Sequence, residues 1–276
     1  MPPDRVLAPF GRRAAPVTAR EQFGPYVVLR CEDPGGPRPQ AGQFYMLQAG
    51  SRWGGGEGER PFLPRAFSVL RAPAHSDELH FLLEDVGPGT RRLSELQAGD
   101  ELLLVGPLGI GFRAPGPGRR AILVGGGVGI APLAIWQDQL RTILQDWPNA
   151  SALTLVGFRD HDHARGAAIL SDPVLATDDG TVGHHGFVTE LLADQLALER
   201  AATPEVYACG PAPMLEAVRA ICAEHGVPAQ LALESGMACG FGACFGCVVP
   251  TRQGYVRLCV DGPVIDAAEL QEVVQA

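Results

Sequence analysis

The segment Ala121-Ile-Leu-Val-Gly125-Gly-Gly-Val-Gly129-Ile-Ala-Pro132 decides the fold of the second half of this chain. Its apolar start is typical of a buried strand, and Pro132 suits the first turn of a helix. A strand, a glycine turn and a helix in this order form the corner that holds a nucleotide pyrophosphate in α/β domains. The spacing is not a strict G-x-G-x-x-G, because Pro132 stands where the third glycine would fall. We expect a nucleotide loop, with tight packing of strand on helix as the alternative. The expected nucleotide contacts are Gly125, Gly126, Gly127 and Gly129.

Downstream of this segment, apolar strands alternate with helices. We expect strands at 153–157 and 205–208, and helices at 132–145, 189–197 and 212–224. Such alternation predicts a parallel sheet that is covered on both faces. Cys209 and Gly210 follow the last of these strands, at the carboxyl edge where open α/β sheets bind ligands. We therefore expect both to contact the nucleotide, although a buried strand-end thiol is an equally ordinary reading of Cys209.

Upstream, from about Val17 to Gly111, the pattern changes to short strands separated by Gly, Pro and Asp. Strands are expected at 25–30, 43–48, 65–70, 79–83 and 101–105. Their regular spacing favours a barrel or sandwich. The glycine-rich segment from Gly50 to Pro61 reads as an exposed, mobile loop. A Pro- and Gly-rich linker at 114–118 separates the two parts.

Two short segments of the barrel region carry residues that suit a flavin. Arg65, Phe67 and Ser68 could offer a guanidinium to a pyrophosphate, and a ring and a hydroxyl to the isoalloxazine. The same residues also occur in ordinary strands. Gly89 and Thr90 precede a helix-like run at 91–96, so free amides there could meet a phosphate. A hairpin loop with Thr90 as a helix N-cap is the alternative.

The last fifth of the chain contains Cys239-Gly-Phe-Gly-Ala-Cys244-Phe-Gly-Cys247, followed by Cys259. This C-x4-C-x2-C…C spacing is typical of four thiolates around a plant-type [2Fe–2S] cluster. Glycines between the cysteines let the backbone wrap around the cluster. A zinc site would normally need two C-x2-C pairs, and only Cys244 and Cys247 form one. We therefore expect Cys239, Cys244, Cys247 and Cys259 to be metal ligands.

The remaining cysteines and the histidines indicate no second site. Cys222 lies on the apolar face of its helix and is expected in the core, and Cys31 has no partner motif. His161 and His163 sit among charged residues and are expected to be solvated. Neither a Ser/His/Asp set nor a pair of carboxylates stands out, so hydrolysis has no support.

Composition bounds the class of protein. The chain has 276 residues, a net charge of −9 and seven cysteines. This length suggests two domains with an appendage, and the negative charge argues against a nucleic acid partner. The longest uncharged run contains four glycines and a proline, which excludes a membrane span there. Reduced thiols, a cluster and an N-terminus without a signal pattern favour the cytoplasm.

Taken together and in this order, the motifs resemble the ferredoxin–NAD(P) reductase superfamily. Specifically, they are similar to the electron-transfer subunits of B-type dihydroorotate dehydrogenase, from Val17 to Asp266. The motifs that carry the likeness are Pro64-Arg-Ala-Phe-Ser68, Val86-Gly-Pro-Gly-Thr90, Gly106-Pro-Leu-Gly109, Gly125 to Leu133, Gly186-Phe-Val-Thr189, Tyr207-Ala-Cys-Gly-Pro211, Met214, and Glu234 to Val264 with its four cysteines.

The resemblance implies a β-barrel domain that binds FAD at 1–114, an α/β parallel-sheet domain that binds NAD(H) at 115–230, and a small C-terminal [2Fe–2S] segment at 231–276. It also implies a partner, an FMN-containing dihydroorotate dehydrogenase catalytic subunit, in a heterotetramer. Electrons would run from FMN through the cluster and FAD to NAD. Hydride transfer itself requires no acid–base residue, so no catalytic residue is named.

Some points stay open at this stage. The flavoprotein subunit of a ferredoxin-dependent transhydrogenase or of a sulfide dehydrogenase is an alternative, and so is a zinc-stabilised regulator without redox chemistry. Glu234 is followed by Ser-Gly, where Glu-Arg is commoner in the family. The choice of nucleotide is also open: Asp160 could bind ribose hydroxyls of NAD, whereas Arg159 could bind the 2′-phosphate of NADP.

Overall fold

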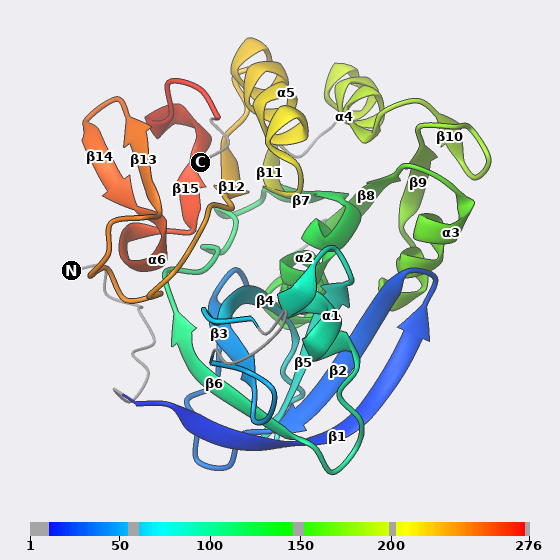
Figure 1. Ribbon diagram of the computed structural model, residues 1–276. Helices are drawn as coiled ribbons and strands as arrows, with labels where there is room; N and C mark the ends of the chain where they lie inside the picture. The colour runs from blue at the N-terminus through cyan, green and yellow to red at the C-terminus, as the bar shows by residue number, and fades with distance from the viewer. Residues whose placement is uncertain (1–10, 55–60, 146–151, 199–202, 274–276) are drawn as a thin grey trace.

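The computed structural model describes residues 11–54, 61–145, 152–198 and 203–273 (Figure 1). Half of the expected loop from Gly50 to Pro61 lies outside these ranges, because they leave out 55–60. In Figure 1 a barrel occupies the bottom of the view and a sheet with helices the top, with the C-terminal segment beside that sheet.

The first half of the described chain forms a closed, antiparallel, six-stranded barrel in the order β1-β2-β5-β4-β3-β6. Its strands are β1 (Arg13–Phe23), β2 (Tyr26–Glu32), β3 (Phe44–Ala49), β4 (Arg65–Arg71), β5 (Glu78–Glu84) and β6 (Glu101–Leu108). A short helix, α1 (Pro88–Ser94), connects β5 to β6. Leu29, Leu47, Phe81 and Leu104 are fully buried inside the barrel. Closure leaves no unpaired strand edge in the barrel wall.

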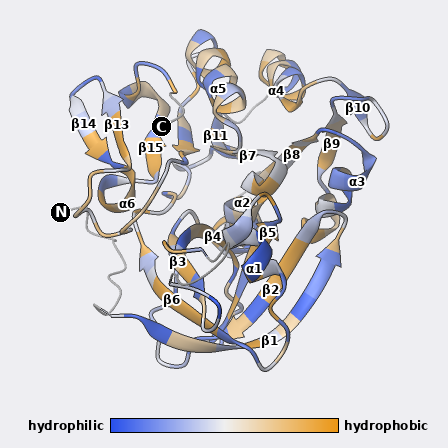
Figure 2. Cartoon of the chain, in the orientation of Figure 1, coloured by the Kyte–Doolittle hydropathy of each residue, from blue (hydrophilic) through white to orange (hydrophobic). Residues whose placement is uncertain are grey.

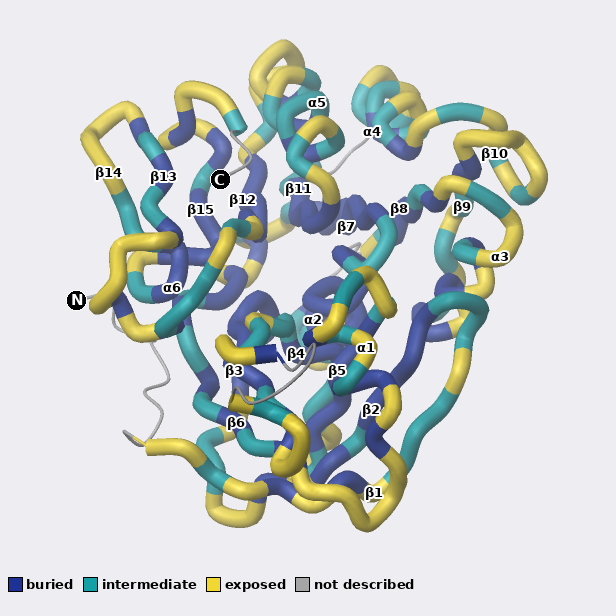
Figure 3. Tube along the Cα trace, in the orientation of Figure 1, coloured by how far each residue is buried: buried dark blue, intermediate teal, exposed yellow. Residues whose placement is uncertain are grey.

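The second half forms a sheet that has seven strands within the described residues, in the order β10-β9-β8-β7-β11-β12-β15. Its strands are β7 (Arg120–Gly126), β8 (Ala152–Phe158), β9 (Val174–Thr177), β10 (His184–His185), β11 (Pro204–Cys209), β12 (Ala229–Ala232) and β15 (Val264–Asp266). Neighbours are parallel except β12 and β15. Every residue of the central strand β7 is buried (Figure 3), which explains its run of apolar residues.

Helices cover both faces of this sheet: α2 (Ile130–Leu144), α3 (His161–Ala164), α4 (Val188–Ala197) and α5 (Ala212–Glu224). Alternate residues of a strand point to opposite faces. Tyr207 of β11 packs on Trp136 of α2, at 5.3 Å between ring centroids, on the face toward the barrel. Its neighbour Val206 shares a core cluster with Leu215 of α5 on the other face. Helix α5 accordingly carries both hydrophobic and hydrophilic residues (Figure 2).

The C-terminal segment does not stand apart from the sheet. It contains a hairpin of β13 (Val248–Thr251) and β14 (Gly254–Arg257), then α6 (Leu258–Asp261), and returns to the sheet as β15. Strand β12 spans positions 230 and 231, between which we expected a boundary, and pairs with β15. Leu258 and Ile265 share one core cluster with Leu231. Packing on the sheet therefore contributes to the order of this short segment.

The expected fold class, a barrel and a parallel-sheet domain with a C-terminal appendage, is confirmed. One helix was placed wrongly: α1 begins at Pro88, not at 91, because Pro88 presets a helical φ and Gly87 precedes it in an extended conformation. Cys222 is buried in the core, as expected, and Cys31 is buried there as well. Within the described residues, no helix is long and apolar enough to cross a membrane.

Candidate functional site

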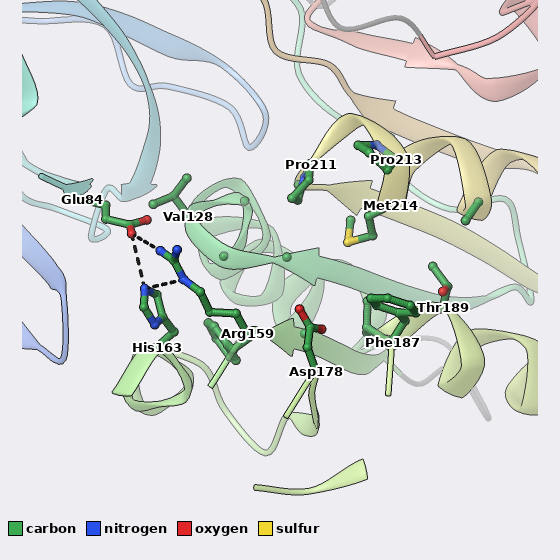
Figure 4. Close-up of a pocket in the computed structure, with 18 of the residues that line it drawn as sticks. Glu84, Val128, Arg159, His163, Asp178, Phe187, Thr189, Pro211, Pro213 and Met214 are labelled. Carbon is green, nitrogen blue, oxygen red and sulfur yellow. Dashed lines mark hydrogen bonds and ion pairs between the residues drawn. The ribbon is translucent and has the colours of Figure 1, made fainter. Parts of the chain in front are cut away.

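A cavity of about 660 Å³ opens at the carboxyl edge of the parallel sheet (Figure 4). Four of the expected nucleotide contacts line it, namely Gly126, Gly127, Gly129 and Gly210. The opposite wall comes from the segments that begin α4 and α5 and includes Phe187, Thr189 and Met214. Figure 4 shows Met214 and Phe187 on one side of the cavity and Arg159 on the other.

The glycine loop is shaped by a close approach of two backbones. A Cβ on Gly129 would lie 2.6 Å from the backbone nitrogen of Gly210 and closer still to the Cys209 carbonyl group. Gly127 has a φ of +55°, a conformation that side chains rarely adopt. Glycine at these two positions lets the turn after β7 lie directly against the end of β11.

The other two expected contacts, Gly125 and Cys209, lie beneath the cavity and do not line it. Cys209 is buried at the end of β11. Burial, with a smaller contribution from the charge of Glu234, raises the pKa of its thiol well above the ordinary value. Cys209 is therefore a neutral thiol at physiological pH.

Charged side chains gather at one end of the cavity (Figure 4). Nη2 of Arg159, which follows β8, lies 2.7 Å from Oε1 of Glu84, the last residue of β5. Nε of Arg159 donates to Nε2 of His163 at 2.8 Å. The expectation that His163 is solvated was wrong: its side chain is only 15% exposed, because Tyr26 packs edge-on against its ring. His161 is exposed, as expected.

A smaller cavity of about 170 Å³ lies between the barrel and the sheet domain. Phe67 and Ser68, two of the expected flavin contacts, line it together with Leu82, Leu233 and Met237. Val128 and Glu234 border both cavities. Ligands in the two cavities would therefore meet at these two residues.

Glu234 is the ionisable group at this junction. Its side chain is exposed to the cavities, and desolvation by the protein groups close around it raises the pKa of its carboxyl. Glu234 lines both cavities.

Arg65, Gly89 and Thr90 do not line the smaller cavity and instead form a group of their own. A Cβ on Gly89 would lie 2.6 Å from Nε of Arg65, so only glycine leaves room for the guanidinium there. The guanidinium also lies 6.0 Å from the ring centroid of Trp53. The Thr90 hydroxyl donates to the Gly87 carbonyl at 3.0 Å and accepts from the Val86 amide at 2.9 Å. This arrangement suits an anionic group placed at Arg65.

The four C-terminal cysteines form two pairs. Sγ of Cys247 and Sγ of Cys259 are 3.2 Å apart, without a disulfide, and Cys239 hydrogen-bonds Cys244. Each iron of a [2Fe–2S] cluster takes two thiolates, so two pairs match the donor set. Within the described residues, no group of three or more His, Cys, Asp or Glu side chains is drawn together around one metal position.

The backbone around these sulfurs suits thiolates. The amide of Cys259 donates to Sγ of Cys247 at 3.4 Å, and the amide of Gly246 donates to Sγ of Cys244 at 3.5 Å. Burial opposes ionisation of Cys239, but hydrogen bonds from the backbone amides of Phe241, Cys244 and Ala243 and from the Cys244 thiol outweigh it and lower its pKa to about 7. Burial raises the pKa of Cys259 to about 12, so metal binding must displace its proton.

The buried cysteines outside this group should be chemically inert in the folded protein. Burial raises the pKa of Cys31 and of Cys222 from 9.0 to about 12. Because only the thiolate reacts, the reactive fraction at pH 8 falls by about a thousandfold. We expect iodoacetamide at pH 8 to leave both unmodified in native protein and to modify both in denaturant, as measured by peptide mass spectrometry. Equal labelling rates in the two states would contradict this assignment.

Several residues of these cavities were not expected from the sequence. Glu84 and Tyr26 belong to the barrel and reach the nucleotide cavity only because the two domains pack together. Phe187, Thr189 and Met214 stand in motifs that carry the family likeness, and this was the one signal that could have found them.

Comparisons with known proteins agree with this arrangement. Residues 234–271 match the family model of the iron-sulfur cluster binding domain of dihydroorotate dehydrogenase B. The chain is 34% identical over 240 residues to the dihydroorotate dehydrogenase B (NAD(+)) electron transfer subunit of Caldanaerobacter subterraneus, covering 85% of this chain and 88% of the relative. The same-named subunit of Desulforamulus reducens is 34% identical over 268 residues and is covered at 94%, as is this chain.

Solved structures show the same fold. The structure of an NADH-dependent reduced ferredoxin-NADP oxidoreductase superposes with a TM-score of 0.76 and 25% identity, covering 95% of this chain and 91% of that one. A ferredoxin NADP+ reductase from Neisseria gonorrhoeae, with bound FAD and NADP, has a TM-score of 0.61 and 21% identity over 78% of this chain and 92% of its own. The extent and identity of the sequence matches establish that this chain belongs to the family of electron transfer subunits of dihydroorotate dehydrogenase B.

Proposed function

We propose that this chain passes electrons between an FMN-containing dihydroorotate dehydrogenase catalytic subunit and NAD, in pyrimidine biosynthesis. Its cofactors are FAD and a [2Fe–2S] cluster. When bound, FAD exchanges hydride with a nicotinamide and single electrons with the cluster. The protein's own part is to position these groups and to keep water away from them.

The observation that carries this proposal is the continuity of three sites. Val128 and Glu234 are common to the larger and the smaller cavity. Met237 lines the smaller cavity and lies two positions before Cys239. A Cβ on Gly240 would lie 2.5 Å from Cγ of Met46, so the cysteine loop lies against strand β3 of the barrel. A nucleotide, a flavin and a cluster bound at these sites would follow one another without a gap.

We assign a role to each group of side chains on this basis. Gly126, Gly127 and Gly129 let the pyrophosphate of NAD approach the backbone, and Gly210 does so at the nicotinamide end. Phe67 and Ser68 contact the isoalloxazine. The apolar side chains of Leu82 and Leu233 line the same cavity and exclude water from it. Arg65 meets the FAD pyrophosphate, with Gly89 and Thr90 beside it. Gly125 and Cys209 support the loop from beneath.

The partner subunit is proposed to dock over the cysteine loop. The aromatic rings of Phe241 and Phe245 are 52% and 62% exposed there, and Cys244 between them is exposed as well. The guanidinium carbon of Arg257 lies 5.6 Å from the ring centroid of Phe245, in cation–π contact with it. An exposed aromatic pair beside an electron carrier is a suitable centre for a protein interface. The family likeness supports a heterotetramer as the assembly.

Replacing Phe245 by aspartate should weaken this docking. We expect the affinity for the catalytic subunit to fall at least about tenfold, because a charge replaces an exposed aromatic ring that docking would bury. The visible spectrum of the variant should match that of the wild type. Binding is measured by calorimetry with the purified FMN-containing subunit. Val174→Asp, at an exposed apolar residue at the start of β9, is the control and should leave the affinity unchanged.

A second candidate has a specific observation in its favour. The structure with a TM-score of 0.76 is of an NADH-dependent reduced ferredoxin-NADP oxidoreductase, an enzyme named for reduced ferredoxin and NADP. The flavoprotein subunit of such a transhydrogenase would need the same three sites.

Co-purification separates the two candidates. The chain is expressed with an FMN-containing dihydroorotate dehydrogenase, and reduction of NAD by dihydroorotate is measured in the complex. A stable complex that reduces NAD supports the proposed function. No association, together with faster reduction by reduced ferredoxin, would favour the transhydrogenase. A cytoplasmic location remains part of the proposal and is supported by the seven cysteines, none of which forms a disulfide in the described residues.

A further inference from the structure

The charged end of the larger cavity contains few groups that could bind an additional phosphate. The ionisable residues that line the cavity as a whole are Tyr26, Glu84, Arg159, His163, Asp178 and Glu234. Arg159 is the one among them that is always cationic, and three are carboxylic acids. A nucleotide phosphate placed here would need Arg159 as its partner.

Arg159 already has a partner from the other domain. Its Nη2 lies 2.7 Å from Oε1 of Glu84, whose side chain is 17% exposed at the end of barrel strand β5. Oε1 of Glu84 is also 3.4 Å from Nε2 of His163. Figure 4 shows the Arg159 and His163 side chains both directed at the Glu84 carboxylate. The Arg159 side chain is 61% exposed, so its guanidinium is paired with Glu84 at the edge of the cavity, where solvent reaches it.

Both ring nitrogens of His163 already have side-chain partners. Nε of Arg159 donates to Nε2 of His163 at 2.8 Å. Nδ1 of His163 lies 2.7 Å from Oδ1 of Asp160. The ring is therefore engaged by protein groups on both sides.

Asp160, which could have accepted hydrogen bonds from ribose hydroxyls, instead binds groups of α3 outside the cavity. It caps α3, where its Oδ1 accepts from the backbone amide of His163 at 3.0 Å, and it is not among the lining residues. Asp178 lines the cavity instead, at the end of β9 next to Phe158. Glu84 from the barrel and Asp178 from the sheet domain therefore both line the cavity in which the ribose 2′ position, the point of difference between NAD and NADP, would lie.

We propose that Glu84 determines the nucleotide specificity of this cavity by pairing with Arg159. This pairing disfavours the 2′-phosphate of NADP and leaves NAD as the ligand. This inference rests on the proposed function, in which the cavity binds a pyridine nucleotide. A 2′-phosphate could displace Glu84 from Arg159, which would leave the Glu84 carboxylate without its cation. Otherwise it would lie beside the intact pair without a cation of its own. Both arrangements are unfavourable. Because Glu84 comes from the flavin domain, the preference depends on how the two domains pack.

The test is a double-mutant cycle on FAD-loaded protein. Dissociation constants of NAD and NADP are measured by calorimetry for the wild type, Glu84→Gln, Arg159→Ala and the double variant. In Glu84→Gln the ratio of the NADP to the NAD constant should fall at least about tenfold, because Arg159 becomes available. In the double variant the ratio of the two dissociation constants should return to the wild-type value. Glu32→Gln, at the exposed end of neighbouring strand β2, is the matched control and should keep the wild-type ratio.

An unchanged ratio in Glu84→Gln, or a gain that persists without Arg159, overturns the assignment of Glu84. Wild-type protein that prefers NADP overturns it as well. Wild-type protein that binds neither nucleotide would instead overturn the proposed function of the cavity, and the inference with it. If Glu84→Gln does not fold, Arg159→Ala alone still tests the proposal. It should lower the affinity for NADP less than about twofold, because an arginine that is already paired with Glu84 contributes little to phosphate binding. A larger loss would show that Arg159 already serves the 2′-phosphate.

Discussion

Replacing Cys259 by serine is expected to remove the iron and to stop electron transfer from the partner subunit to this chain. Cys259 is buried on α6, with its Sγ 3.2 Å from Sγ of Cys247. A serine hydroxyl is shorter and ionises far less readily than a thiol, so one of four thiolates would be lost at a site that cannot recruit another. We expect iron and acid-labile sulfide to fall below about a tenth of the wild-type content, and electron transfer from the FMN-containing subunit to NAD to fall on the order of a thousandfold.

Two measurements separate a lost cluster from a lost fold. FAD content and NADH-dependent reduction of a small dye should persist in Cys259→Ser, since the flavin and nucleotide cavities contain no residue of α6. Cys222→Ser is the matched control, because Cys222 is equally buried on α5 in the core. It should keep its full iron content. Wild-type iron and sulfide in Cys259→Ser would remove this cysteine from the ligand set.

Replacing Gly129 by alanine is expected to cause the second large effect. The added Cβ would lie 2.5 Å from the carbonyl carbon of Cys209 and 2.6 Å from the nitrogen of Gly210. Both are backbone atoms at the end of a central strand, so neither can move without shifting β11. We expect the free energy of unfolding to fall by about 3 kcal/mol and the affinity for NAD to fall about a hundredfold.

Gly125→Ala offers a comparison within the same loop. There a Cβ would meet Cδ1 of Leu133 at 2.9 Å, the mobile end of a side chain that can change rotamer. This variant should lose less than half as much stability as Gly129→Ala. Chemical denaturation gives the stability and calorimetry gives the NAD affinity. If both variants bind NAD like the wild type, the turn after β7 does not hold the pyrophosphate.

Much of the fold was predictable because its signals are local. The apolar strand before Gly125 and the helix after Pro132 are each specified by residues that are neighbours in sequence. Helix α5 has the bounds that were expected, since its apolar residues recur at helical spacing. The short strands β9, β10, β12, β13, β14 and β15 were missed, because two to four residues carry too little pattern. The longer strand β1 was missed as well.

The candidate site was only partly predictable. Gly126, Gly127, Gly129 and Gly210 line the cavity because a turn between a parallel strand and its helix always opens at the carboxyl edge of the sheet. Gly125 and Cys209 have the same kind of sequence context, but they are buried beneath the residues that line the cavity. Local sequence does not distinguish a residue that faces a ligand from one that supports it.

The amino-acid sequence by itself determined the order of the domains, the four thiols and the glycine turn, because spacing along the chain sets these directly. Only the tertiary structure decided which side chains share a cavity. Glu84 and Arg159 are 75 positions apart and meet because the barrel packs on the sheet, and Val128 and Glu234 border two cavities for the same reason. Contacts of this kind arise from the docking of two surfaces, and no periodicity within either segment specifies how those surfaces dock.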